Sequence, residues 1–245
     1  CYYCHNPVVL GGRLEGKFLP DQVIPFSVSR EDAEKGFKDY VCKKKFVPRA
    51  FYNKKQVESI TGVYFPYWHY NTRLEGKMQG EARNVRVWRT GNTEYTETKY
   101  YQVSREGDVK LENLTENALG KANQELICGV MPYDFKDVKK FQLGFLSGFL
   151  AEKRDIEKKQ IEKKVQQEAR ESAEKLMREQ INGYSSVSVK NADFRALKEK
   201  WSYTLLPVWT ITYKAKNGKI YYYTVRALNG DQISPSFDKT RYIVC

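Results

Sequence analysis

The sequence predicts an α+β protein in which two strand-rich regions form antiparallel sheets and a long helical region lies between them. The aromatic content is high, with 18 Tyr, 12 Phe and 4 Trp among 245 residues. Such a content favours strands with one face in water, because tyrosine packs its ring and keeps its hydroxyl hydrated. Turn signals such as Asn217-Gly218 separate the strand-like segments. Between the two regions, apolar residues recur with helical spacing.

The first α+β unit is expected over residues 13–142. It opens with a short strand at 23–26, and Ser29 with Asp32 three positions later is typical of a capping box that begins a helix ending near Tyr40. A meander of strands follows, with turns predicted at 90–92 and 106–108, and then a helix over 116–127. The expected strands of this meander are residues 62–70, 77–88, 93–104 and 109–111.

The long helical region is expected over residues 143–182, ending near Asn182-Gly183. Its apolar residues form one narrow stripe that must pack on another part of the protein. The stripe contains Ile156, Ile161, Val165, Ala169, Ala173, Leu176, Met177 and Ile181.

The third region, residues 183–245, is expected to be a β-rich unit that packs with the first. Its strands are predicted at 201–214 and 219–228, on either side of the Asn217-Gly218 turn. The segment 205–209, Leu-Leu-Pro-Val-Trp, is similar to the segment 64–68, Tyr-Phe-Pro-Tyr-Trp. This similarity indicates either a degenerate repeat of one strand unit or a coincidence in an aromatic-rich chain.

The formal net charge of +12 and the pI of about 9.3 favour acidic partners such as nucleic acid or an anionic membrane face. Residues 40–57 hold six of the basic side chains and no acidic one, with aromatic residues between them. This combination can grip a phosphate backbone and stack bases, so the loop is a candidate nucleic-acid site. The favoured alternative is a solvated loop whose aromatic residues anchor in the core. The six basic residues are Lys43, Lys44, Lys45, Arg49, Lys54 and Lys55.

Five cysteines, an odd and small number, indicate a reducing compartment such as the cytoplasm. Cys1 and Cys4 have the spacing of a knuckle that supplies two of the four ligands of a zinc site. Cys42 has no such neighbour and is expected to be a buried or incidental thiol. With His5, the same knuckle spells the c-type haem attachment pattern, which would require an exported protein.

No enzyme is expected. Only His5 and His69 could act as bases at neutral pH without a shifted pKa, and His69 lies in a predicted strand. The sequence has no H-E-x-x-H and no G-x-S-x-G. It also has no G-x-x-x-x-G-K-[ST] phosphate cradle, which excludes helicase activity for this chain.

Several motifs together resemble a bacterial family of proteins of unknown function with a TFIIB-type zinc ribbon, often labelled as relatives of the replication-restart helicase. The motifs are Cys1-x-x-Cys4, Leu14-Glu15-Gly16-x-Phe18-x-Pro20-Asp21, Ile24-Pro25-Phe26, Gly62-Val63-Tyr64-x-Pro66-x-Trp68, Tyr95-Thr96-Glu97, Ser147-Gly148-x-Leu150-Ala151 and Leu206-Pro207-Val208-Trp209.

The resemblance implies an amino-terminal ribbon, a mixed domain and a carboxy-terminal membrane segment. Residues 1–12 would then be the remnant of a ribbon knuckle, with Cys1 and Cys4 as metal ligands and zinc bound in a longer parent protein. The chain is accordingly expected to be a fragment.

These observations together predict a non-enzymatic interaction or scaffold domain. It would hold an unknown protein partner on the cytoplasmic side, near the inner face of the membrane, with the anchor supplied by the parent. The alternative is a nucleic-acid-binding module that uses the basic aromatic loop at residues 40–57.

Overall fold

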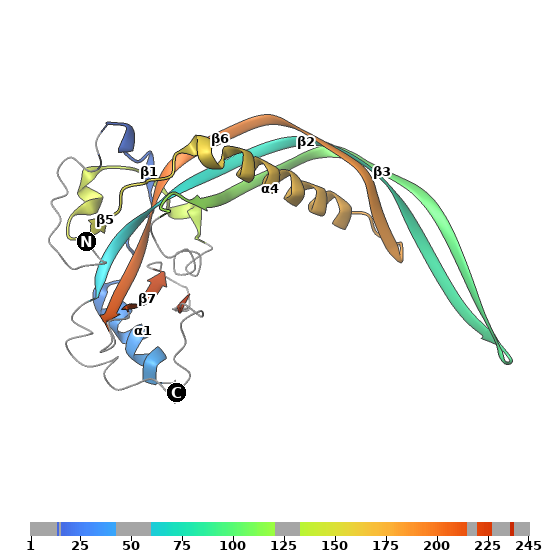
Figure 1. Ribbon diagram of the computed structural model, residues 1–245, viewed down its shortest axis with the longest axis horizontal. Helices are drawn as coiled ribbons and strands as arrows, with labels where there is room; N and C mark the ends of the chain where they lie inside the picture. Colours follow the sequence, from blue (N-terminus) through green and yellow to red (C-terminus); the bar gives the residue numbers. More distant parts are fainter. Residues whose placement is uncertain are drawn as a thin grey trace. The chain divides into compact units, whose positions relative to one another are not determined.

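The structure is a computed structural model that describes Leu14 and residues 16–42, 60–120, 133–214, 220–226 and 236–237. The helices are α1 (Arg30–Cys42) and α4 (Lys158–Glu179), with short 3-10 turns η1 (Gly16–Phe18), η3 (Phe135–Asp137) and η4 (Leu143–Leu146) (Figure 1). The strands are β1 (Gln22–Val23), β2 (Thr61–Thr90), β3 (Thr93–Asn117), β4 (Lys139–Lys140), β5 (Leu150–Ala151), β6 (Ser186–Lys214), β7 (Ile220–Arg226) and β8 (Ser236–Phe237).

All of these strands belong to one eight-stranded mixed sheet with the order β3-β2-β6-β1-β4. In addition, β5 pairs with β2, β7 pairs with β6, and β8 pairs with β7.

The predicted α+β class with separate antiparallel sheets is wrong, because the described part of the chain is dominated by a single mixed sheet. Its strands β2, β3 and β6 contain 30, 25 and 29 residues, whereas α1 and α4 contain 13 and 22. The sheet is mixed because β1 runs parallel to β6, and β5 runs parallel to β2.

The predicted helical region is also too long at its amino-terminal end. Residues 143–157 form η4, the two-residue strand β5 and extended chain, so that α4 begins only at Lys158. Gly148 has a φ of 83°, a conformation that breaks a helix, and Leu150 then pairs with Val63 in the sheet. Within α4 the stripe is confirmed except at Leu176, which is 43% exposed. The buried side chains are Ile161, Val165, Ala169, Ala173 and Met177.

The strand boundaries were predicted in part. The turn after Thr90 is confirmed, with Gly91 at a φ of 61°. The breaks predicted at 71–76 and 106–108 are wrong, because β2 and β3 continue through both. Near the second of these positions, Lys77 of β2 and Glu106 of β3 form an ion pair of 2.8 Å. Residues 116–117 end β3 and do not begin a helix, and 121–127 lie outside the described residues.

Helix α1 begins as predicted, since the backbone N–H of Asp32 donates to Ser29 Oγ at 3.1 Å. This bond satisfies one of the backbone donors that a helix leaves free in its first turn.

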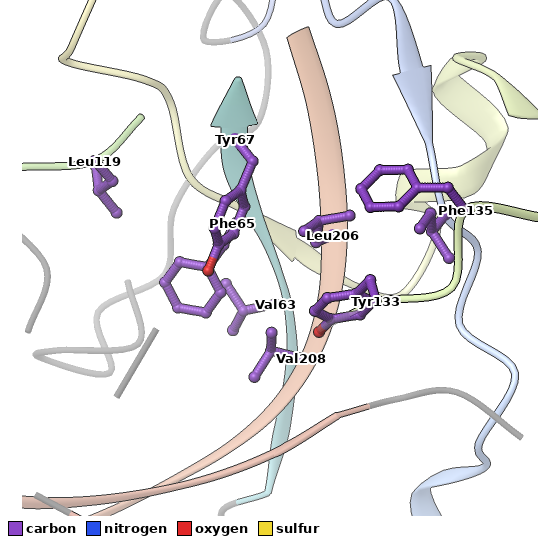
Figure 2. Packing of buried hydrophobic residues seen from close by; sticks show 9 residues of the cluster. Val63, Phe65, Tyr67, Leu119, Tyr133, Phe135, Leu206 and Val208 are labelled. Atoms are coloured by element: carbon purple, nitrogen blue, oxygen red, sulfur yellow. The ribbon is translucent and has the colours of Figure 1, made fainter. Parts of the chain in front are cut away.

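The chain divides into two compact units, and neither is continuous in sequence. Unit 1 comprises Cys1–His69, Thr115–Lys158 and Ser202–Cys245, and unit 2 comprises Tyr70–Leu114 and Lys159–Trp201. The core of unit 1 lies where the first residues of β2 pack with β6 and with the segment before η3 (Figure 2). Its buried members are Ile24, Val63, Phe65, Tyr67, Leu119, Tyr133, Phe135, Leu206 and Val208.

The two similar Pro-x-Trp segments lie in β2 and β6 of unit 1, and both fasten other parts of the chain to the sheet. The indole of Trp68 donates to Ile156 O and that of Trp209 donates to Val28 O, each at 3.0 Å. The carbonyl of Pro66 accepts from the N–H of Ala118, and that of Pro207 accepts from the Tyr133 hydroxyl.

In unit 2, helix α4 packs on one face of the sheet. Burial along β2 alternates from Tyr70 to Met78, as expected for a strand with one face covered. Gly76 lies under the helix, where an added Cβ would be 2.7 Å from Met177 Sδ. The opposite face carries charged side chains in cross-strand ion pairs, such as Glu75 with Arg195 at 2.8 Å.

Candidate interaction surface

The site residues predicted from sequence lie outside the described residues, so their roles stay predictions. This group comprises His5, Cys1, Cys4, Lys43, Lys44, Lys45, Arg49, Lys54 and Lys55.

Two further candidates have described positions. Cys42 is the last residue of α1. His69 is buried in β2, and its ring stacks on Phe135 with centroids 4.1 Å apart.

Within the described ranges, no group of three or more His, Cys, Asp or Glu side chains is arranged to hold a metal ion. The helices described here include none with the length and apolar content needed to cross a membrane.

Exposed apolar side chains are concentrated in residues 84–101 of unit 2, which we call the hairpin end. Of the ten large apolar side chains exposed in the described residues, six lie there. They are Val85, Val87, Trp88, Tyr95, Tyr100 and Tyr101, whereas the other four are Leu19, Leu143, Leu176 and Leu197. A cluster of this kind is more informative than scattered exposed residues, because monomeric proteins rarely gather apolar surface without a use for it.

One face of the hairpin end carries an ordered aromatic stack. Trp88 on β2 and Tyr95 on β3 lie opposite each other, with ring centroids 5.6 Å apart and planes at 13°. The guanidinium of Arg86 lies 5.6 Å from the centroid of the Trp88 ring. Both rings remain partly open to solvent, at 42% and 45% exposed.

The other face carries aliphatic residues. Side chains alternate along a strand, so Val85 and Val87 point away from the face of Trp88. Val87 is 55% exposed and Tyr100 is 71% exposed. Each face of the hairpin end therefore carries exposed apolar side chains.

Among the described strands, none pairs with the outer edge of β2 along the hairpin end, because β6 does not extend that far, and we call this edge open. Strand β6 begins at Ser186, whose hydroxyl accepts from Arg83 Nε, while β2 continues to Thr90. The hairpin of β2 and β3 extends beyond the start of β6 (Figure 1). Beyond Val85, β2 pairs in the described part of the chain with β3 alone.

Most charges of the hairpin end are paired. Arg89 lies 3.3 Å from Glu94, and Lys99 lies 3.5 Å from Glu97. Arg86 has no carboxylate partner among the residues described, so its positive charge is available to a ligand.

A hollow of about 370 Å³ lies next to the hairpin end on the charged face of unit 2. Its lining is polar, and its two charged residues, Glu81 and Lys190, lie 3.4 Å apart in an ion pair. Since their charges satisfy each other, this hollow is a weaker candidate than the apolar surface beside it.

Sequence reasoning missed the hairpin end, although a signal was present. From Arg73 to Arg83 the odd-numbered positions of β2 are mostly charged, which is the pattern of a solvent-facing side. At Val85 and Val87 these positions become aliphatic, while Trp88 continues the other face. A strand that loses its polar side near a turn indicates an exposed apolar surface.

Comparisons with known proteins give one distant curated relative. The uncharacterized protein YdjG of Bacillus subtilis (strain 168) is 28% identical over 205 residues, which cover 84% of this chain and 60% of that protein. The chain therefore spans about 60% of the length of the relative that it matches. No protein-family model and no solved structure matches the chain.

Proposed function

We propose that this chain is a non-enzymatic interaction module and that the hairpin end of unit 2 is its contact surface. The observation that supports the proposal is the concentration of exposed apolar side chains on an ordered hairpin, with the guanidinium of Arg86 beside them.

The energetics support a surface that is covered in use. A buried aromatic side chain contributes about 150–250 Å². Covering the exposed halves of Trp88 and Tyr95 would thus remove on the order of 100 Å² each from water, which corresponds to roughly 2–3 kcal/mol per ring. The stack is already ordered, so Trp88 and Tyr95 would lose little side-chain entropy when a partner binds.

The resemblance to the zinc-ribbon family extends the proposal to a protein partner near the inner face of a membrane, with zinc and an anchor supplied by a longer parent. The alternative, a nucleic-acid-binding module, rests on the basic loop at 40–57 and has a separate test, which is DNA binding by a variant of that loop.

Photo-crosslinking in cells tests the contact surface. A photoreactive phenylalanine analogue placed at Tyr95 should give a discrete crosslinked species with a macromolecular partner. The matched control is the same analogue at Leu143, a residue of unit 1 that is 68% exposed. A crosslink of equal yield from both positions, or none from Tyr95, would contradict the proposal.

A further inference from the structure

We propose that the partner contributes an extended segment that adds to the hairpin end as a strand, along the open edge of β2 at residues 86–90. This inference rests on the proposed function and specifies its partner. The occupant is a peptide segment of another protein with alternating side chains.

The backbone of β2 presents hydrogen-bonding groups at this edge. The N–H of Ser185 donates to Arg83 O at 2.9 Å, and the N–H of Val85 donates to Ser185 Oγ at 3.1 Å. Odd-numbered residues of β2 therefore direct their backbone groups to the β6 side. The same alternation continues to Val87 and Arg89, whose N–H and C=O groups point to the edge that β6 leaves open.

The turn of the hairpin indicates the same directions for the backbone groups of β2. Residues that flank a two-residue turn exchange hydrogen bonds, so Thr90 directs its backbone groups to β3. Even-numbered residues of β2 thus pair with β3, which again leaves Val87 and Arg89 facing outward.

Strand addition also accounts for the apolar side chains on both faces. A flat partner surface would cover one face of a two-stranded ribbon. An added strand alternates its own side chains, so it lies beside Val87 on one face and beside Arg86 and Trp88 on the other. It would also continue the line of β6.

The chemistry of the site defines the segment. The position beside Val87 favours Val, Ile or Thr, which pack well across strands. On the other face, an acidic side chain beside Arg86 would pair with a guanidinium that forms no ion pair within the described ranges. The positions that donate backbone hydrogen bonds to β2 exclude proline, which lacks the N–H.

Two other occupants are less well supported. A second copy paired through the same short edge would bury far less than the roughly 1,200 Å² typical of stable interfaces. A phosphate backbone would need several unpaired cations along the ribbon, whereas Arg89 and Lys99 already have carboxylate partners.

The test uses the full chain and a display library of random twelve-residue peptides. Selection should enrich peptides in which β-branched residues alternate with residues of another kind, including an acidic one. Val87→Pro should weaken the selected peptide at least tenfold, since it removes an outward N–H and places a ring in the path of the added strand. Proline is tolerated where the N–H faces solvent, so this variant should fold.

The matched control is Thr96→Pro. Cross-strand partners such as Arg89 with Glu94 and Trp88 with Tyr95 place Thr96 directly opposite Val87, with its N–H at the other edge of the ribbon. Thr96→Pro should change affinity less than threefold.

Several outcomes would overturn the inference. Equal losses from both proline variants, or no enriched peptide, would do so. A third outcome is binding to anionic vesicles or to DNA, abolished by Trp88→Ala and unchanged by Val87→Pro. This result would overturn strand addition, but the hairpin end would remain the contact surface. Failure of the Tyr95 crosslink would instead contradict the proposed function itself.

Discussion

A methyl group added at Gly76 should disturb the packing of α4 on the sheet of unit 2. The added Cβ would lie 2.6 Å from the Phe194 ring and 2.7 Å from Met177 Sδ, which are distances that require both side chains to move. Overpacking a buried site costs about 1–3 kcal/mol. The lower flexibility of the unfolded chain returns about 0.4–1 kcal/mol. Gly76→Ala should therefore reduce the free energy of unfolding by about 1–2 kcal/mol.

Gly107→Ala is the matched control. Gly107 also lies in a strand of unit 2, but an added Cβ would meet no atom within 4 Å. Only the unfolded-state effect applies there, so this variant should be more stable than wild type by about 0.4–1 kcal/mol. The two variants should differ by about 2 kcal/mol, or roughly 4–8 °C in melting temperature for a chain of this size.

The assay is thermal and urea unfolding followed by circular dichroism. A double variant, Gly76→Ala with Met177→Ala, adds a coupling measurement, because neighbouring residues typically couple by about 0.5–3 kcal/mol. Equal stabilities for the two glycine variants, together with no coupling to Met177, would refute the packing of α4 described here.

Three further outcomes are expected. Replacing Lys43, Lys44 and Lys45 together with Glu should abolish salt-sensitive DNA binding if the basic loop is a nucleic-acid site, and unchanged affinity in a titration at low salt would exclude that site. Burial raises the pKa of Tyr203 from 10.0 to about 12, with the charge of nearby Arg154 opposing the rise. The folded state therefore keeps the Tyr203 hydroxyl protonated at a pH where the unfolded chain ionises it, so the free energy of unfolding falls as the pH rises from 10 to about 12. Tyr203→Phe should make this alkaline decline smaller by about 2–3 kcal/mol, as measured in unfolding curves at high pH. Ser29→Ala should cost about 1 kcal/mol by removing the cap of α1. Ser29→Thr should preserve stability, because its hydroxyl can still accept from the Asp32 N–H and donate to the Asp32 carboxylate, and urea unfolding of both variants would check this.

Local features were predictable because they depend on residues close in sequence. The cap at Ser29, the turn at Gly91 and the buried stripe of α4 from Ile161 to Met177 are set by contacts within a few positions. Each of these predictions is confirmed, except that Leu176, which was placed in the stripe, is exposed.

The fold class was not predictable because it depends on pairing between distant segments. The hydroxyl of Thr72 donates to Lys198 O, a contact between β2 and β6 that spans 126 positions. No local pattern reveals that such strands share a sheet. Turn-forming residues at 106–108 remain in β3, where Lys77 and Glu106 form an exposed ion pair across the hairpin.

The candidate surface was missed because exposure depends on which part of a strand a packed helix covers. Val87 and Trp88 have the composition of core residues. Val87 lies on the face of β2 that is open to solvent from Arg73 onward, and Trp88 lies beyond the buried positions of the face on which α4 packs. The zinc ligands and the basic loop predicted from sequence stay predictions.

The long separation between β2 and β6 has a consequence for synthesis of the protein. Thr72 leaves the ribosome 126 residues before its partner Lys198. At about 5–20 residues per second, that interval lasts roughly 6–25 s. The hairpin of β2 and β3 can form early, but the edge later covered by β6 stays open throughout the interval. During translation this nascent sheet would be vulnerable to pairing with other chains, so cells should show aggregation when its elongation stalls before β6.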